Sequence, residues 1–178
     1  MITTPKPSNV RIAGPADEDQ LYNVLSEELF QENGTFSLSE RKGRGFIHDT
    51  VNRLNYGIIG IIEEGGVIAG CIGMNLGTFW YSDDWHVEEY WNLVRLPYRK
   101  HIGNDSHRSF YAKDLINFAK WYADYMNLIL NIGIISTQRT EAKCRLYSRV
   151  LQPTGQFFMH NLHLAKGPGI QKLTVEFK

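Results

Sequence analysis

Hydrophobic positions recur along this chain with two spacings, and the order of the two spacings predicts the fold. Spacings of three and four residues give one apolar face of a helix, whereas short apolar or β-branched runs are typical of strands. Helical spacing occurs in residues 16–30, 39–55, 110–124 and 138–151. Strand-like runs occur in residues 10–13, 58–63, 67–76, 86–95, 128–135 and 155–162, with 173–177 as a further candidate.

The order of these segments is strand, two helices, three strands, helix, strand, helix, strand. Antiparallel strands that lead into two strand–helix units favour a mixed sheet with helices on both faces. We therefore predict an α/β fold of the α+β type, with a mixed, mostly antiparallel central sheet of six to seven strands. Gly65-Gly66 predicts a hairpin turn between two of these strands. Residues 1–9 predict a flexible arm, and residues 10–178 a single domain.

Composition and charge exclude several classes of partner. The 19 Lys and Arg residues equal the 19 Asp and Glu residues, so no overall field attracts nucleic acid or a membrane surface, and we expect neither partner. No apolar run is long enough to span a membrane. Cys71 and Cys144 have no metal or redox spacing and the six histidines are scattered, so we expect no metal site. Reduced thiols and a cytoplasmic location follow as the default expectation.

The stretch of residues 92–124, NLVRLPYRKHIGNDSHRSFYAKDLINFAKWYAD, carries most of the candidate chemistry. An apolar run ends at Leu96, a basic polar loop follows, and an amphipathic helix begins near Phe110. The first N–H groups of a helix lack internal partners, and the helix dipole adds positive potential, so such a helix start favours an anion. An ordinary connection with a solvated basic loop is the alternative that this stretch alone leaves open.

Three motifs in this order resemble those of the GNAT (Gcn5-related) N-acetyltransferases. The segment LVRLPYR, residues 93–99, resembles the strand end Val-x-Pro-x-x-Arg, with the proline displaced by one residue. RSFYAKDL, residues 108–115, resembles the end of the pyrophosphate loop Arg/Gln-x-x-Gly-x-Gly/Ala, although the loop glycines are missing. RLY, residues 145–147, resembles the Leu-Tyr of a late helix. The order of elements over residues 10–162 also matches that family.

The resemblance implies transfer of an acetyl group from acetyl-CoA to an amine, with acetyl-CoA as co-substrate and no metal. The backbone of Leu93 and Val94 would pair with the pantetheine arm. Two registers are open for the pyrophosphate loop, residues 99–103 and residues 107–112, and we prefer the second because phosphate must meet the N–H groups that open the helix. The expected cofactor-binding residues are Leu93, Val94, Arg99, Arg108, Ser109, Phe110, Tyr111, Ala112, Lys113 and Thr140, the last standing in place of a family Asn.

Tyr147 is the candidate general acid that the resemblance implies, and Glu88 and Glu89 are the candidate bases. Alternation along a strand puts the two carboxylates on opposite faces, and counting from Val94 slightly favours Glu88. His86 is a further candidate base. The structural alternatives are solvated strand charges for the two glutamates and a packed core aromatic for Tyr147.

The acceptor side would be formed by residues 31–39 and by the aromatic, acidic connection of residues 77–85. Aromatic rings beside Asp83 and Asp84 suit a small-molecule or peptide amine. The sequence leaves open a homodimer. It also leaves open a non-catalytic acyl-CoA-binding or interaction module on the same fold, because fold does not fix function.

Overall fold

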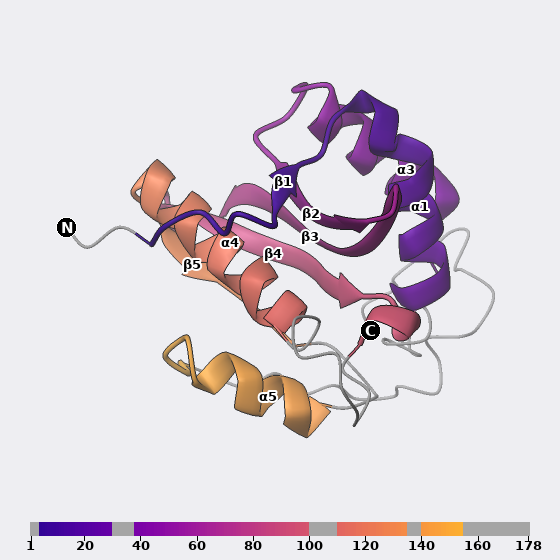
Figure 1. The fold of residues 1–178 in the computed structure, drawn as a ribbon. Helices are drawn as coiled ribbons and strands as arrows, with labels where there is room; N and C mark the ends of the chain where they lie inside the picture. Colours follow the sequence, from indigo (N-terminus) through magenta and orange to yellow (C-terminus); the bar gives the residue numbers. More distant parts are fainter. Residues whose placement is uncertain (1–3, 30–37, 100–109, 135–139, 155–178) are drawn as a thin grey trace, which may run out of the picture.

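In the described part of the chain, one five-stranded sheet forms the centre of the protein (Figure 1). The computed structural model describes residues 4–29, 38–99, 110–134 and 140–154. The strand order is that of the sequence: β1 (Arg11–Ile12), β2 (Ile58–Glu64), β3 (Val67–Thr78), β4 (Trp85–Val94) and β5 (Ile129–Asn131). The first four strands are antiparallel neighbours, and β5 runs parallel to β4. The predicted mixed, mostly antiparallel sheet is therefore confirmed. The number of six to seven strands is not, because the segments expected to add strands, 155–162 and 173–177, lie outside the described residues.

Helices cover both faces of this sheet, as the patterning predicted (Figure 1). The helical elements are η1 (Pro15–Asp17), α1 (Glu18–Val24), the π-helical turn η2 (Leu25–Leu29), α3 (Glu40–Val51), η3 (Leu96–Tyr98), α4 (Tyr111–Met126) and α5 (Thr140–Ser148). One apolar cluster joins the sheet to α4, and a second joins it to α1 and α3. The run Ile58–Ile62 is buried at every position because β2 lies between these two clusters.

Two glycines of the sheet are fixed by close approach of a ring. A Cβ on Gly60 would lie 2.6 Å from the ring of Phe118 on α4. A Cβ on Gly73 would lie 2.3 Å from the ring of Trp91 on the opposite face. The missing side chains in β2 and β3 therefore let the Phe118 ring of α4 on one face, and the Trp91 ring of β4 on the other face, lie against the backbone.

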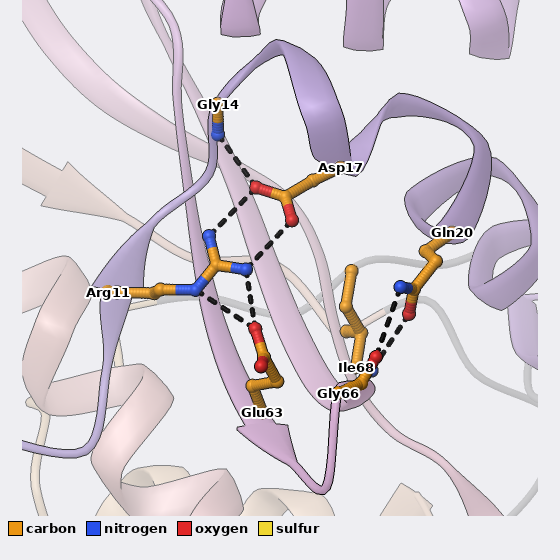
Figure 2. Close-up of polar contacts among 7 residues, drawn as sticks. All are labelled: Arg11, Gly14, Asp17, Gln20, Glu63, Gly66 and Ile68. Atoms are coloured by element: carbon orange, nitrogen blue, oxygen red, sulfur yellow. Dashed lines mark hydrogen bonds and ion pairs between the residues drawn. The ribbon is translucent and has the colours of Figure 1, made fainter.

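Arg11 joins β1 to its neighbours (Figure 2). Its guanidinium binds both carboxylate oxygens of Asp17 at 2.8 Å and also contacts Glu63 of β2 at 2.6 Å. The hydrogen bonds from Arg11 lower the pKa of Asp17. Gln20 of α1 binds the β2–β3 turn, accepting from Ile68 N–H and donating to Gly66 O (Figure 2). The Arg11 contacts hold the two-residue edge strand β1 to η1 and β2, and the Gln20 contacts hold α1 to the turn.

The described part of the N-terminal arm, residues 4–9, lies along α4. The N–H of Thr4 donates to Asp124 at 2.7 Å, and Asn9 donates to Asp114 at 2.8 Å. The arm therefore has defined contacts in this region of the chain.

The strand β5 is shorter than its apolar run predicted. It spans Ile129–Asn131 instead of residues 128–135, and it pairs only with the first half of β4, from His86 to Glu88. Beyond Glu88, β4 continues to Val94 with β3 on one side. On the other side, no strand of the described residues pairs with this second half of β4. One edge of β4 is thus unpaired after Glu88 among the described strands, and this part of β4 contains Leu93 and Val94 of the LVRLPYR segment.

Candidate functional site

The open edge of β4 presents backbone groups at Val94. The N–H of Arg95 donates to Ala69 O of β3 at 2.9 Å. Because backbone groups alternate between the two sides of a strand, the N–H and C=O of Val94 point away from β3, and those of Leu93 point toward it. The Val94 carbonyl accepts a hydrogen bond from Arg99 Nε at 2.6 Å. Of the two residues expected to pair with pantetheine, Val94 is therefore the one whose backbone faces the open edge.

A β-bulge at Tyr90 changes which residues of β4 share a face. Trp91 is paired with Gly73 and Glu89 with the next residue of β3, Met74, so Tyr90 is an extra residue in the ladder. Tyr90 and Trp91 both contact the ring of Phe46 on α3. A bulge of this kind places two residues against one on the partner strand and shifts the alternation by one position.

The bulge puts Glu89, not Glu88, on the face of Val94. Val87 and Val94 both pack with the cluster around α4, and Glu89 lies on the same side, beneath Tyr147 of α5. Counting by alternation from Val94 therefore gave the wrong face, because the bulge at Tyr90 lies between the two positions. Glu88 lies on the opposite face, with its carboxylate 3.7 Å from the point that a Cβ on Gly77 would occupy.

Tyr147, Glu89 and Asn92 meet at the start of the open edge. Tyr147 Oη donates to Glu89 Oε1 at 3.4 Å and accepts from Asn92 Nδ2 at 3.2 Å. Glu89 is a half-buried residue, but its Oε2 atom is shielded from solvent and has no hydrogen-bond partner among the described residues. Two of the three catalytic candidates are thus brought together, and the third is on the other side of the sheet.

Burial changes the acidity of Glu89. Desolvation raises the pKa of its carboxyl group to about 8, an effect opposed by the hydrogen bond from Tyr147 and by the positive charge of Lys143. A carboxyl group with a pKa near neutral pH can both accept and return a proton during a reaction cycle, which is what a general base requires.

His86 is buried and stacks on Phe79, with ring centroids 4.3 Å apart. The side chains of Glu88 and His86 both approach Gly77, so His86 lies on the face of the sheet opposite to Tyr147 and Glu89. The aromatic connection that follows β3 is exposed, with Trp80 95% accessible. It lies at the end of β4 opposite to Val94. Residues 31–37 of the other expected acceptor segment lie outside the described residues.

The start of α4 lies beside the end of β4. Val94 Cγ2 and Leu115 Cδ1 approach the point of a Gly70 Cβ to 3.3 and 3.4 Å. The helix begins at Tyr111 after Phe110, which provides no side-chain cap. A helix start favours an anion in general, and the choice between the two loop registers stays a prediction because residues 100–109 lie outside the described residues. Ala112 is half-buried and Lys113 is exposed at this helix start.

The remaining expected phosphate ligands have different surroundings. Arg108 and Ser109 lie outside the described residues. Tyr111 is buried, and its hydroxyl donates to Glu64 of β2. Thr140 is exposed at the first position of α5.

Arg99 lies in a buried ion pair, which the sequence did not indicate. Its guanidinium contacts Glu28 of the π-helical turn at 2.6 Å, and Glu28 also accepts from Leu96 N–H at 3.1 Å. These contacts, together with the bond to the Val94 carbonyl, fix the end of β4 against η2. Two of the donor groups of Arg99 are thus committed to the protein itself.

Asn92 and Glu28 are the residues of this region that sequence reasoning missed. Asn92 stands two positions before Val94, in a strand otherwise dominated by apolar residues, and that polar exception was the available signal. Glu28 gave none, because an acidic residue in an amphipathic helix is ordinarily solvated.

A separate cavity of about 290 Å³ lies between α1 and α3, lined by Glu18, Arg44, Gly45, Ile47 and His48. Its polar groups are engaged with one another or with neighbouring side chains. No helix within the described ranges has the length and apolar character to cross a membrane.

Comparison with known proteins finds the fold but no relative in sequence. No family model and no curated protein matches the chain. An integron cassette protein from a salt-marsh metagenome is similar at 19% identity, with a TM-score of 0.62 over 86% of this chain and 89% of that one. A probable acetyltransferase matches at 14% identity and a TM-score of 0.60, over 95% and 99%. The enzyme AAC(6')-Iy, solved with a CoA bisubstrate analogue, matches at 12% identity and a TM-score of 0.61, over 85% and 95%.

Proposed function

We propose that this protein, which has the GNAT acetyltransferase fold, transfers the acetyl group of acetyl-CoA to a primary amine in the cytoplasm. The observation that carries the proposal is the meeting of Tyr147 and Glu89 beside the open edge of β4. An acyl transfer from a thioester to an amine needs one group that removes a proton and one that returns a proton to the sulfur. A buried carboxyl group beside a phenol supplies both.

Binding of acetyl-CoA is assigned to two neighbouring features. The outward backbone of Val94 suits the amide groups of a pantetheine arm that lies along β4 as an added strand. The start of α4, residues 110–113, suits the pyrophosphate, with Arg108 as an additional ligand. Both features lie at the end of β4, so one elongated molecule can contact them together.

The proposed reaction is a direct attack. Glu89 accepts the proton of the amine, the amine nitrogen bonds to the acyl carbon, and Tyr147 returns a proton to the departing sulfur. The Val94 N–H is suited to bind the thioester oxygen as charge develops on it. The acceptor is proposed to be a small-molecule or peptide amine. Aminoglycosides are a first choice for screening, because one protein of the same fold was solved with a bisubstrate analogue that joins CoA to acetylneamine.

The decisive experiment measures release of free CoA thiol from acetyl-CoA with a panel of aminoglycosides, polyamines and peptide amines. We expect turnover with at least one acceptor, and a fall in kcat of about 100-fold or more for Tyr147→Phe and Glu89→Gln. Glu88→Gln is the matched control on the opposite face and should keep the parent rate. Equal losses for the two glutamate variants would refute the assignment of Glu89.

The position of the pyrophosphate is tested separately by calorimetry with acetyl-CoA. We expect Arg108→Ala to weaken binding, because Arg108 precedes the start of α4. If Arg99→Ala weakens binding in a folded protein while Arg108→Ala does not, the phosphate lies in residues 99–103 instead.

A non-catalytic acyl-CoA-binding module is the second candidate. The observation in its favour is the shielding of Glu89 Oε2, which an amine cannot touch directly in this arrangement. Tight binding of acetyl-CoA, together with no thiol release for any acceptor in the panel, would establish this second function and exclude the first.

A further inference from the structure

Asn92 occupies a position beside the proposed acid and base that neither the motifs nor the resemblance indicates. It lies three residues after Glu89 on β4, yet both side chains reach Tyr147 because the bulge at Tyr90 restores them to one face. Asn92 Nδ2 lies 3.2 Å from Tyr147 Oη. Asn92 Oδ1 is shielded from solvent and has no hydrogen-bond partner among the described residues. In this arrangement the donor atom of the amide faces the phenol.

The contact with Asn92 restricts the hydrogen bonds of the phenol. An amide nitrogen can only donate, so Tyr147 Oη acts as acceptor toward Asn92. A phenol carries one proton, and while Glu89 is ionised that proton is directed to Glu89 Oε1, 3.4 Å away. Once Glu89 takes up a proton, its own O–H can donate to Tyr147. The phenol proton then turns to another acceptor, while Asn92 continues to donate to the same oxygen.

We infer that Asn92 is a positioning residue that fixes the direction of the Tyr147 hydroxyl, so that protonation of Glu89 releases the Tyr147 proton to the departing sulfur. The inference rests on the proposed acetyl transfer for its chemical consequence. Its physical content, a hydrogen bond from Asn92 that stabilises the tyrosinate form of Tyr147, holds for the protein without any substrate.

The proton balance closes within the three residues and the substrates. The amine nitrogen bonds to the acyl carbon, and the carbon–sulfur bond breaks with its electron pair on sulfur. The proton of the amine passes to Glu89, and the proton of Tyr147 passes to the thiolate. Glu89 then returns its proton to Tyr147, which restores both groups. The product amide and the free thiol of CoA carry all atoms of the two substrates, and no proton is drawn from solvent.

Lys143, on the same helix as Tyr147, acts on Glu89 by its positive charge. Asn92, on β4, is neutral. The effect of Asn92 on Tyr147 is therefore a hydrogen-bond effect that substitution can isolate from the charge of Lys143.

The test is a titration of Tyr147 by NMR, with tyrosine labelled at the ring carbon that bears the hydroxyl. Comparison with Tyr147→Phe assigns the resonance. Loss of the donor should raise the titration midpoint of Tyr147 by about one pH unit, because a hydrogen bond to the charged form favours that form. We expect this rise in Asn92→Leu, which removes both polar atoms. We also expect it in the smaller Asn92→Ala, which removes the donor without adding charge or bulk if the leucine variant fails to fold.

Asn75 provides a matched control on the same sheet. Its Nδ2 atom donates to Tyr90 Oη at 3.4 Å, an equivalent pair away from Glu89. Asn75→Ala should leave the Tyr147 midpoint unchanged. In the parent the Tyr147 resonance should also show a step near pH 8 from the ionisation of Glu89, and this step should vanish in Glu89→Gln.

The outcomes separate this inference from the proposed function. An unchanged Tyr147 midpoint in both Asn92 variants overturns the role of Asn92, whatever the enzyme assay gives. An absence of thiol release with every acceptor overturns the acetyl transfer, while the titration still decides whether Asn92 orients Tyr147. If turnover occurs, Asn92→Ala should lower kcat with little change in the KM for acetyl-CoA. A change in KM alone would contradict a positioning role.

Discussion

The buried carboxyl group of Glu89 should make the stability of the protein depend on pH. The pKa of Glu89 is raised from 4.5 to about 8 in the folded protein, mainly by desolvation. A carboxyl group whose pKa is higher in the folded state binds its proton more tightly there, so its contribution to stability is present at low pH. That contribution is lost progressively as the pH rises from the unfolded value toward the folded one.

The size of the effect follows from the shift. One pKa unit corresponds to about 1.4 kcal/mol, so ionised Glu89 costs the folded state about 5 kcal/mol at pH values above both constants. Between pH 5 and pH 7 the loss amounts to about 2–3 kcal/mol of the free energy of unfolding. Glu89→Gln cannot ionise and keeps a polar group beside Tyr147, so this part of the pH dependence should disappear.

The assay is urea unfolding at pH 5, 6, 7 and 8, followed by tryptophan fluorescence. The difference in the free energy of unfolding between Glu89→Gln and the parent should grow in favour of the variant with each step in pH. Glu88→Gln changes the same residue type on the opposite face and should follow the parent. A constant difference between Glu89→Gln and the parent across the four pH values would refute the burial of the carboxyl group.

Two further changes test the packing and the ion pair that shape the site. Gly60→Ala would place a Cβ 2.6 Å from the fully buried ring of Phe118 and should destabilise the protein by about 2 kcal/mol. Gly45 is exposed in a helix and has open space around it, so Gly45→Ala should be neutral or stabilising by up to about 1 kcal/mol. Thermal unfolding of the two variants should therefore move in different directions. Glu28→Ala removes the carboxylate that faces the buried guanidinium of Arg99 and should cost about 3 kcal/mol, whereas loss of the more exposed neighbouring pair in Glu27→Ala should cost less than about 1 kcal/mol. Equal losses in denaturant unfolding for these two variants would show that the Glu28 pair is solvated.

Local chemistry explains the elements that could be predicted from the sequence. The helix after Ser39 begins where its side chain accepts from Lys42 N–H, and the hairpin turns at Gly65 and Gly66, both with positive φ. The apolar stripe of α4 and the run of β2 identified the two layers of the core. Each of these features is encoded within one turn of helix or one hairpin.

The features that were missed depend on pairing between distant segments. The bulge at Tyr90 depends on Gly73 of β3, whose missing side chain makes room for the ring of Trp91. The strand β5 ends where its pairing with β4 ends, at Glu88, and an apolar run in the sequence does not show where pairing between two strands ends. The assignment between Glu88 and Glu89 changed for this reason, since alternation holds only while the ladder is regular.

The bulge also has a consequence for comparing this chain with others of its fold. Deletion of Tyr90 would leave Glu89 opposite Met74 and Trp91 opposite Gly73, so every remaining pair of the ladder would survive. The strand would lose its local bend, and the number of residues between Glu89 and Val94 would fall by one. Alternation from Val94 would then run without interruption to Glu89. An alignment of this strand with a distant sequence must therefore allow one extra residue before the carboxylate and its partner can be matched.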